Sequence, residues 1–111
     1  MTTVTRETHE ALAGISAGKA DVLELREGQL EPSGLDARTF ALVKIATLIA
    51  LDGPPASYAR HVADAIGSGA SAEDILGVLR AVAPQVGGPR VVAAAPEIML
   101  ALGLSLPHDA E

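Results

Sequence analysis

The stretch from Leu35 to Met99 decides the fold of this chain. Apolar residues recur in it every three to four positions, and Pro and Gly separate the segments, which is typical of packed helices. No segment alternates with the period of a β-strand, so the sequence predicts an all-α domain. The segments follow one another as LDARTFALVKIATLIAL (35–51), DGPP (52–55), YARHV (58–62), GSG (67–69), SAEDILGVLRAV (71–82) and GGPR (87–90), before a last apolar run.

The first of these segments predicts a helix from Ala37 to Leu51 with Asp36 as its N-cap. At about 100° per residue, the polar side chains fall on different sides of the helix. They are Arg38, Thr39, Lys44 and Thr47. A helix without a polar face is expected to be buried on all sides. In so short a chain this predicts a central helix that is partly covered by a second copy of the protein.

The segment after the DGPP turn predicts an amphipathic helix that ends near Gly67 and Gly69. Its apolar stripe is expected to contain Tyr58, Val62 and Ile66. Its polar face carries Ser57, Arg60, His61 and Asp64.

A further helix is predicted after Ser71, which with Asp74 resembles a capping box. We expect Pro84 and the glycines at 87–88 to end this helix, Pro89 to open the last helix, and Pro96 to kink or split that helix. The apolar stripe of the helix after Ser71 is expected to contain Ile75, Leu76, Leu79 and Val82.

The part of the chain before Leu35 carries two weaker helical patterns, one ending near Gly18 and one ending at Gly28. The first is marked by Ala11, Leu12 and Ile15, and the second by Val22, Leu23 and Leu25. We therefore expect one domain over residues 1–111 with about five to six helices. It would consist of variable N-terminal helices (1–34), a core (35–104) and a loose tail (105–111).

The composition favours self-association and excludes several classes of partner. Of the 111 residues 49% are hydrophobic, and the mean hydropathy is +0.33, with one Phe, one Tyr and no Trp. A domain of this size cannot bury all of these side chains within itself, which predicts a homo-oligomer. The net charge is −6, and Lys and Arg are scattered singly, so no nucleic-acid partner is expected.

The sequence also predicts no membrane partner and a cytoplasmic location. The longest apolar run, residues 40–51, is shorter than the roughly 20 residues that span a bilayer, and no signal peptide is visible. The chain contains no cysteine, which excludes disulfides and thiolate metal sites and fits a reducing compartment.

The order and spacing of the segments between Leu35 and Met99 resemble the carboxymuconolactone decarboxylase-like family, which includes the alkyl hydroperoxide reductase D-type thiol peroxidases. The resemblance implies an all-helical protein with a central antiparallel helix pair, assembled as a homotrimer or homohexamer. It covers about 65 residues. Some members decarboxylate a lactone acid, lack the cysteine pair and keep the histidine.

The peroxidase branch of this family carries the signature C-x-x-C-x-x-x-H. Aligned on His61, the two cysteine positions are occupied by Pro54 and Ser57, and the family's acidic position falls at Leu42 or Ala41. A hydroxyl cannot replace the thiolate that reduces a peroxide. The chain is therefore expected to belong to the branch without the cysteine pair and to have no thiol peroxidase activity.

His61 is the candidate catalytic residue, since an imidazole exchanges protons near neutral pH. Ser57 lies one turn before it, and Tyr58 and Arg60 are further candidate binding residues on the same helix. Lys44 could bind a carboxylate. The alternatives remain open: His61 as a half-buried histidine bonded to Ser57 or to a backbone carbonyl, and Lys44 as a surface side chain with its stem on apolar neighbours.

No metal site or cofactor is predicted, because His9, His61 and His108 are far apart in sequence. Two functions remain. The first is an oligomeric, non-catalytic or small-molecule-binding protein. The second is a cofactor-free lyase or isomerase that acts on a small carboxylated, lactone-like substrate, with His61 as proton shuttle and Lys44 or Arg60 on the carboxylate.

Overall fold

The computed structural model describes residues 2–19, 30 and 33–107, and the chain divides into two compact units, 1–34 and 35–111. The described residues form an all-α structure without a strand, as predicted. The helices are α1 (Arg6–Ser16), α2 (Ala37–Leu51), α3 (Pro55–Gly67), α4 (Ala72–Val86) and α5 (Gly88–Ala101). The units divide where the core was expected to begin, and a single domain over 1–111 stays a prediction.

The first unit contains α1, which begins where the Thr5 hydroxyl accepts a hydrogen bond from the Thr8 backbone N–H at 3.2 Å. Gly18 follows the helix with a φ of +84°, a left-handed conformation that glycine adopts without steric cost. The predicted end near Gly18 is confirmed. The second predicted pattern, from Val22 to Gly28, lies outside the described residues.

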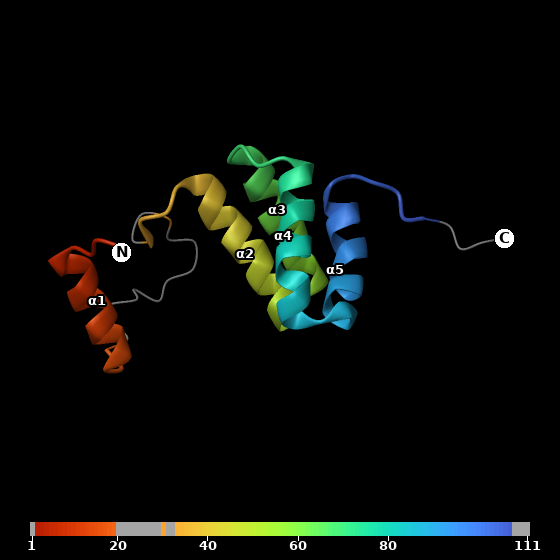
Figure 1. The fold of residues 1–111 in the computed structure, drawn as a ribbon. Coiled ribbons are helices and arrows are strands. Elements are labelled where there is room, and N and C mark those ends of the chain that lie inside the picture. Colours follow the sequence, from red (N-terminus) through yellow and green to blue (C-terminus); the bar gives the residue numbers. More distant parts are fainter. Residues whose placement is uncertain (1, 20–29, 31–32, 108–111) are drawn as a thin grey trace. The chain divides into compact units, whose positions relative to one another are not determined.

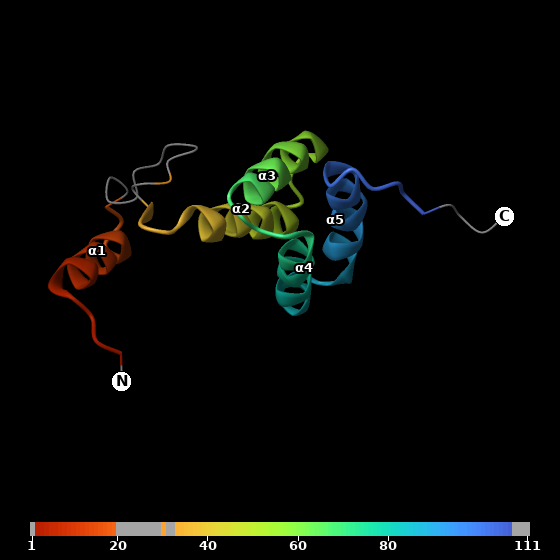
Figure 2. The ribbon, with the colours of Figure 1, turned by 90° about the horizontal axis from the view of Figure 1, so that it is seen from above.

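The second unit is built from α2 to α5. Figures 1 and 2 show that α2 and α3 run in opposite directions, and so do α4 and α5. The central helix is α2, which contacts α3, α4 and α5, and α5 in turn packs on α3 and α4. The predicted central antiparallel pair is therefore α2 and α3. No helix in the described part of the chain is long and apolar enough to cross a bilayer.

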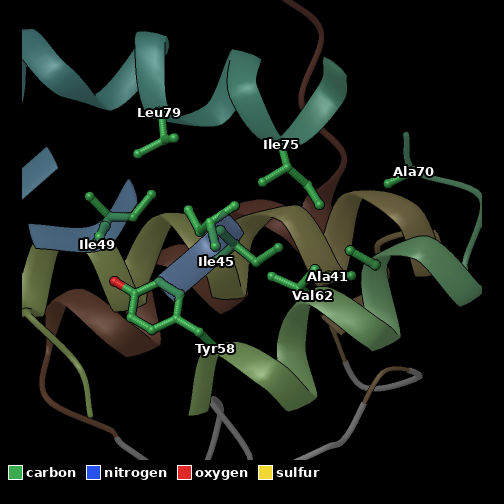
Figure 3. Close-up of a cluster of buried hydrophobic side chains, with 11 residues drawn as sticks. Ala41, Ile45, Ile49, Tyr58, Val62, Ala70, Ile75 and Leu79 are labelled. Atoms are coloured by element: carbon green, nitrogen blue, oxygen red, sulfur yellow. The ribbon is translucent and has the colours of Figure 1, made fainter. Parts of the chain in front are cut away.

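The core of this unit lies between the four helices, and Figure 3 shows most of its side chains. Ile45, Ile49 and Ile75 are fully buried, and Val62 is 1% exposed. Burial of each such aliphatic side chain contributes about 1.5–3 kcal/mol to folding. The other buried members are Ala41, Tyr58, Ala65, Ala70, Leu79, Ala94 and Ile98.

The helix α2 has the predicted bounds and cap, since Oδ1 of Asp36 accepts a hydrogen bond from the Thr39 N–H at 2.7 Å. The expected burial on all sides is wrong for the single chain. Val43 is 49% exposed and Leu51 is 73% exposed, because the helices that pack on α2 leave one of its sides uncovered. Coverage of that side by a second copy stays a prediction.

Two apolar residues assigned to buried stripes lie outside them. Ile66 is 44% exposed, and Leu76 is 43% exposed. In α3 the buried stripe continues from Val62 to Ala65 rather than to Ile66, which lies about 100° further round the helix. Leu76 is displaced by the same angle from Ile75. A helix that is packed on one side buries only a narrow stripe of residues, and the residues beside that stripe stay partly exposed.

The prolines disrupt the last two helices less than expected. Helix α4 continues through Pro84 to Val86, and α5 continues through Pro96 to Ala101, so α5 is not split. Each proline removes one backbone hydrogen bond, but packing on both sides of the missing bond keeps the helices continuous. Gly87, with a φ of +89°, separates them and ends α4. Pro89 lies in the first turn of α5, as predicted.

Candidate functional site

The start of α3 sets the positions of the candidate site residues. Asp52 adopts a left-handed conformation with a φ of +53°, and the Gly53 N–H donates to the Leu48 carbonyl at 2.8 Å. A Cβ atom on Gly53 would lie 2.6 Å from Cδ2 of Leu48, so a larger residue here would have to displace the end of that side chain. Pro54 then serves as the N-cap, and Pro55 begins the helix.

Ser57 and His61 are both half-buried on α3, one turn apart. Residues with this spacing lie about 5–6 Å apart at their Cβ atoms, so the hydroxyl and the imidazole share one side of the helix. Arg60 is exposed, and so is Asp64. The structure thus places the Ser57–His61 pair at the edge of the packed unit and the Arg60 guanidinium on open surface.

Tyr58 contributes its ring to the core. The residue is only 3% exposed, and Figure 3 shows its side chain reaching from α3 toward α2, beside Ile45 and Ile49. Burial raises the pKa of the Tyr58 hydroxyl, and the carboxylates of Asp52 and Glu97 raise it further, because two negative charges oppose the formation of a third.

Sequence reasoning did not identify Asp52 and Glu97 as neighbours of the candidate site. Asp52 ends α2, and Glu97 lies on α5, half-buried. Packing of α5 against α3 brings Glu97 into electrostatic range of Tyr58. The available signal was that Glu97 is the single charged residue in the run VVAAAPEIML (91–100).

Lys44 packs against an aromatic ring on its own helix. Its Nζ lies 4.9 Å from the centre of the Phe40 ring, one turn earlier on α2. A cation over an aromatic face at this distance is attracted by about 0.5–1 kcal/mol at a partly exposed site. This contact holds the ammonium group of Lys44 against its own helix, and binding of a carboxylate by Lys44 stays a prediction.

The positions that correspond to the peroxidase machinery carry neither a thiol nor an acidic group. Pro54 has no side chain that can react, and Ser57 carries a hydroxyl. Ala41, at the acidic position, is 4% exposed in the core, and Leu42 lines a groove between α2 and α4. None of these four residues can form a thiolate, and neither Ala41 nor Leu42 can relay a proton.

Three apolar grooves lie on the surface of the second unit. The α2–α4 groove has a volume of about 360 Å³, the α4–α5 groove about 300 Å³ and the outer α5 groove, beside the C-terminal segment, about 390 Å³. None of the five candidate residues lines them. Among residues 2–19, 30 and 33–107, no three His, Asp or Glu side chains are grouped so that they could hold a metal ion.

Comparison with known proteins identifies the family. The family model described as carboxymuconolactone decarboxylase matches residues 18–98, which is most of the chain and includes α2, α3, α4 and nearly all of α5. No curated protein and no solved structure matches the chain. The all-α architecture, the position of His61 on α3 and this match lead to one conclusion: the chain belongs to the carboxymuconolactone decarboxylase family, and it lacks the cysteines of the family's thiol peroxidases.

Proposed function

We propose that this protein is a non-catalytic, self-associating member of its family, assembled as a homotrimer or homohexamer in the cytoplasm and without thiol peroxidase activity. The observation that carries the proposal is the α2–α4 groove. It is lined by apolar side chains over most of its length, and Arg38 and Thr39 are its polar lining residues. The others are Leu42, Val43, Ala46, Val78, Ala81 and Val82.

Contact between copies of the chain would bury the exposed apolar side chains of this groove. Val43 is 49% exposed, although it belongs to a helix without a polar face. Each square ångström of apolar surface that leaves water contributes about 25 cal/mol, so a packed helix face contributes several kcal/mol to association. A second copy of the chain would supply such a face and would complete the burial that the composition of α2 requires.

The test is the oligomeric state of the full chain, measured by light scattering coupled to size exclusion. We expect an assembly of three or six copies for the unmodified protein and a smaller species for Val43→Glu. The variant places a charge where the partner would remove it from water, which costs several kcal/mol.

Ala63→Glu is the matched control, because Ala63 is exposed on α3 and does not line the α2–α4 groove. This control should keep the assembly of the unmodified chain. A stable monomer of about 11 kDa at micromolar concentration would contradict the proposal.

The second candidate function is a cofactor-free lyase or isomerase that acts on a small carboxylated substrate. The observation in its favour is the pair of half-buried side chains Ser57 and His61, one turn apart on α3. His61 would move a proton, and Lys44 or Arg60 would bind the carboxylate. A screen of small lactone acids tests this function: turnover that disappears in His61→Ala and in Ser57→Ala, with the assembly intact, would place it ahead of the non-catalytic function.

A further inference from the structure

Two of the apolar grooves are lined by residues of α5, which packs beside α4 (Figure 1). Ala95 and Met99 line both the α4–α5 groove and the outer α5 groove. The two hollows share these two lining residues, and together we call them the α5 trough. Each part alone reaches the lower range of small-molecule pockets, which begins near 300 Å³.

The walls of the α5 trough are formed by large apolar side chains that stay in contact with water. Val92 is 71% exposed, Leu104 is 52% exposed and Leu76 is 43% exposed. Met99, which lies between the two parts, has an unbranched side chain that adjusts to ligands of different shape. Binding of an apolar chain to such a surface is favourable, because it removes apolar area from water.

A single charged side chain lines the α5 trough, and it is acidic. Glu73, in the first turn of α4, lines the α4–α5 groove, and no cationic side chain lines either part. The neighbouring Asp74 is occupied by hydrogen bonds with Ser71 and an ion pair with Arg38. Within the described part of the chain Glu73 makes no salt bridge, so its carboxylate is available to a ligand.

We propose that the α5 trough binds an elongated apolar molecule with a cationic head, of the class of long-chain alkylammonium ions. The head lies at Glu73, and the chain covers Ala95 and Met99. Anionic amphiphiles are disfavoured, because the trough offers them no cation and the protein carries a net charge of −6. This site shares no lining residue with the α2–α4 groove, and neither Ser57 nor His61 lines it, so it goes beyond the proposed function.

The experiment compares three probes of equal chain length with the full protein: decyltrimethylammonium, decanol and decanoate, each below its micellar concentration. Calorimetric titration gives the dissociation constants, and circular dichroism checks that the helices persist. We expect decyltrimethylammonium to bind tightest and decanoate weakest. Glu73→Gln should weaken binding of the ammonium probe about two- to fivefold, the range of an exposed ion pair, and should strengthen binding of decanoate.

Two controls separate the charge from the apolar surface. Glu10→Gln removes an exposed carboxylate from α1 and should leave all three dissociation constants unchanged. Ala95→Phe fills the point that the two grooves share and should weaken all three probes about tenfold or more. If that variant does not fold, Leu106→Ser, at an exposed position in the outer α5 groove, should weaken all three probes to a smaller extent.

Three outcomes would overturn the proposal. In the first, the three probes bind with equal dissociation constants, and Glu73→Gln changes none of these constants. The second is binding that persists unchanged in both Ala95→Phe and Leu106→Ser, which would place the ligand elsewhere. The third is dissociation of the assembly by Ala95→Phe with no binding of the ammonium probe, which would show that another copy covers the trough. Val43→Glu, which tests the assembly, should not change binding of the ammonium probe. A failure of the proposed assembly and a failure of the α5 trough as a ligand site therefore give different results.

Discussion

Nη2 of Arg38 lies 2.8 Å from Oδ1 of Asp74, and this ion pair joins the first turn of α2 to the first turn of α4. The same carboxylate accepts the Ser71 N–H through Oδ2 at 2.9 Å, while the Ser71 hydroxyl accepts the Asp74 N–H at 3.0 Å. One carboxylate therefore completes the capping box of α4 and links the first turns of two core helices. These hydrogen bonds, first that from Ser71 and then that from Arg38, lower the pKa of Asp74.

The first prediction concerns acid stability. Because the pKa of Asp74 is lowered in the folded protein, its stabilising contribution is present above the ordinary carboxyl pKa of about 3.9 and is lost as the pH falls below it. Asp74→Asn should lower the melting temperature at neutral pH and should reduce the further loss on acidification. Thermal unfolding followed by circular dichroism across this pH range measures both effects. Asp64→Asn, at an exposed position on α3, should change neither; equal behaviour of the two variants would contradict the prediction.

The second prediction concerns Tyr58, the only tyrosine of a chain without tryptophan. Its tyrosinate absorbance in the near ultraviolet should appear above the ordinary pKa of about 10, because burial and the nearby carboxylates of Asp52 and Glu97 raise this pKa. Asp52→Asn with Glu97→Gln should lower the pKa again but not to its ordinary value, since burial is the larger cause. The raised pKa also means that Tyr58 stabilises the fold below about pH 10 and ceases to do so as the pH rises further. Titration at the ordinary pKa would show that the ring is not buried.

The third prediction concerns the core. Ile75→Ala should destabilise the protein by about 2–5 kcal/mol, because Ile75 is fully buried and its truncation leaves a cavity. Leu12→Ala is the control: Leu12, on α1, is 59% exposed, so its truncation should change stability by about 0.5 kcal/mol or less. Chemical denaturation of both variants measures the difference. Equal losses would contradict the prediction.

The fourth prediction concerns His61. This residue is half-buried at the edge of the second unit, so His61→Ala should leave the fold intact and cost about 1 kcal/mol rather than the 3–5 kcal/mol of a truncated core aromatic. Thermal or chemical unfolding measures the cost. A loss in the upper range would show that the imidazole is a packing residue and would remove the main argument for the lyase or isomerase function.

The fifth prediction concerns redox chemistry. With Pro54 and Ser57 in the thiol positions and no cysteine in the chain, we expect no reduction of hydrogen peroxide or organic peroxides with dithiol reductants. The assay compares the protein with a heat-denatured sample after removal of trace metal and haem. A rate that depends on the folded protein would require a peroxidase mechanism without a thiolate.

The sequence alone determined the features that depend on residues a few positions apart. Asp36 as the cap of α2, Ser71 with Asp74 as the capping box of α4, and the end of α3 at Gly67 were all predicted and all are present. Their hydrogen bonds close over three or four residues, so the local sequence contains both partners. The spacing of these helices also indicated the family, although the sequence contains no residue whose chemistry names a substrate.

The tertiary structure alone decided which apolar residues are covered and which distant groups meet. Periodicity placed Ile66 and Leu76 on apolar stripes. Their burial depends on how far the neighbouring helices extend around α3 and α4, and both residues lie beside the covered stripe and stay exposed. The meeting of Glu97 with Tyr58 and the trough beside Met99 result from the way α5 packs on α3 and α4. Such pairs are separated by tens of residues, and their distance depends on the whole packing arrangement, which no local pattern specifies.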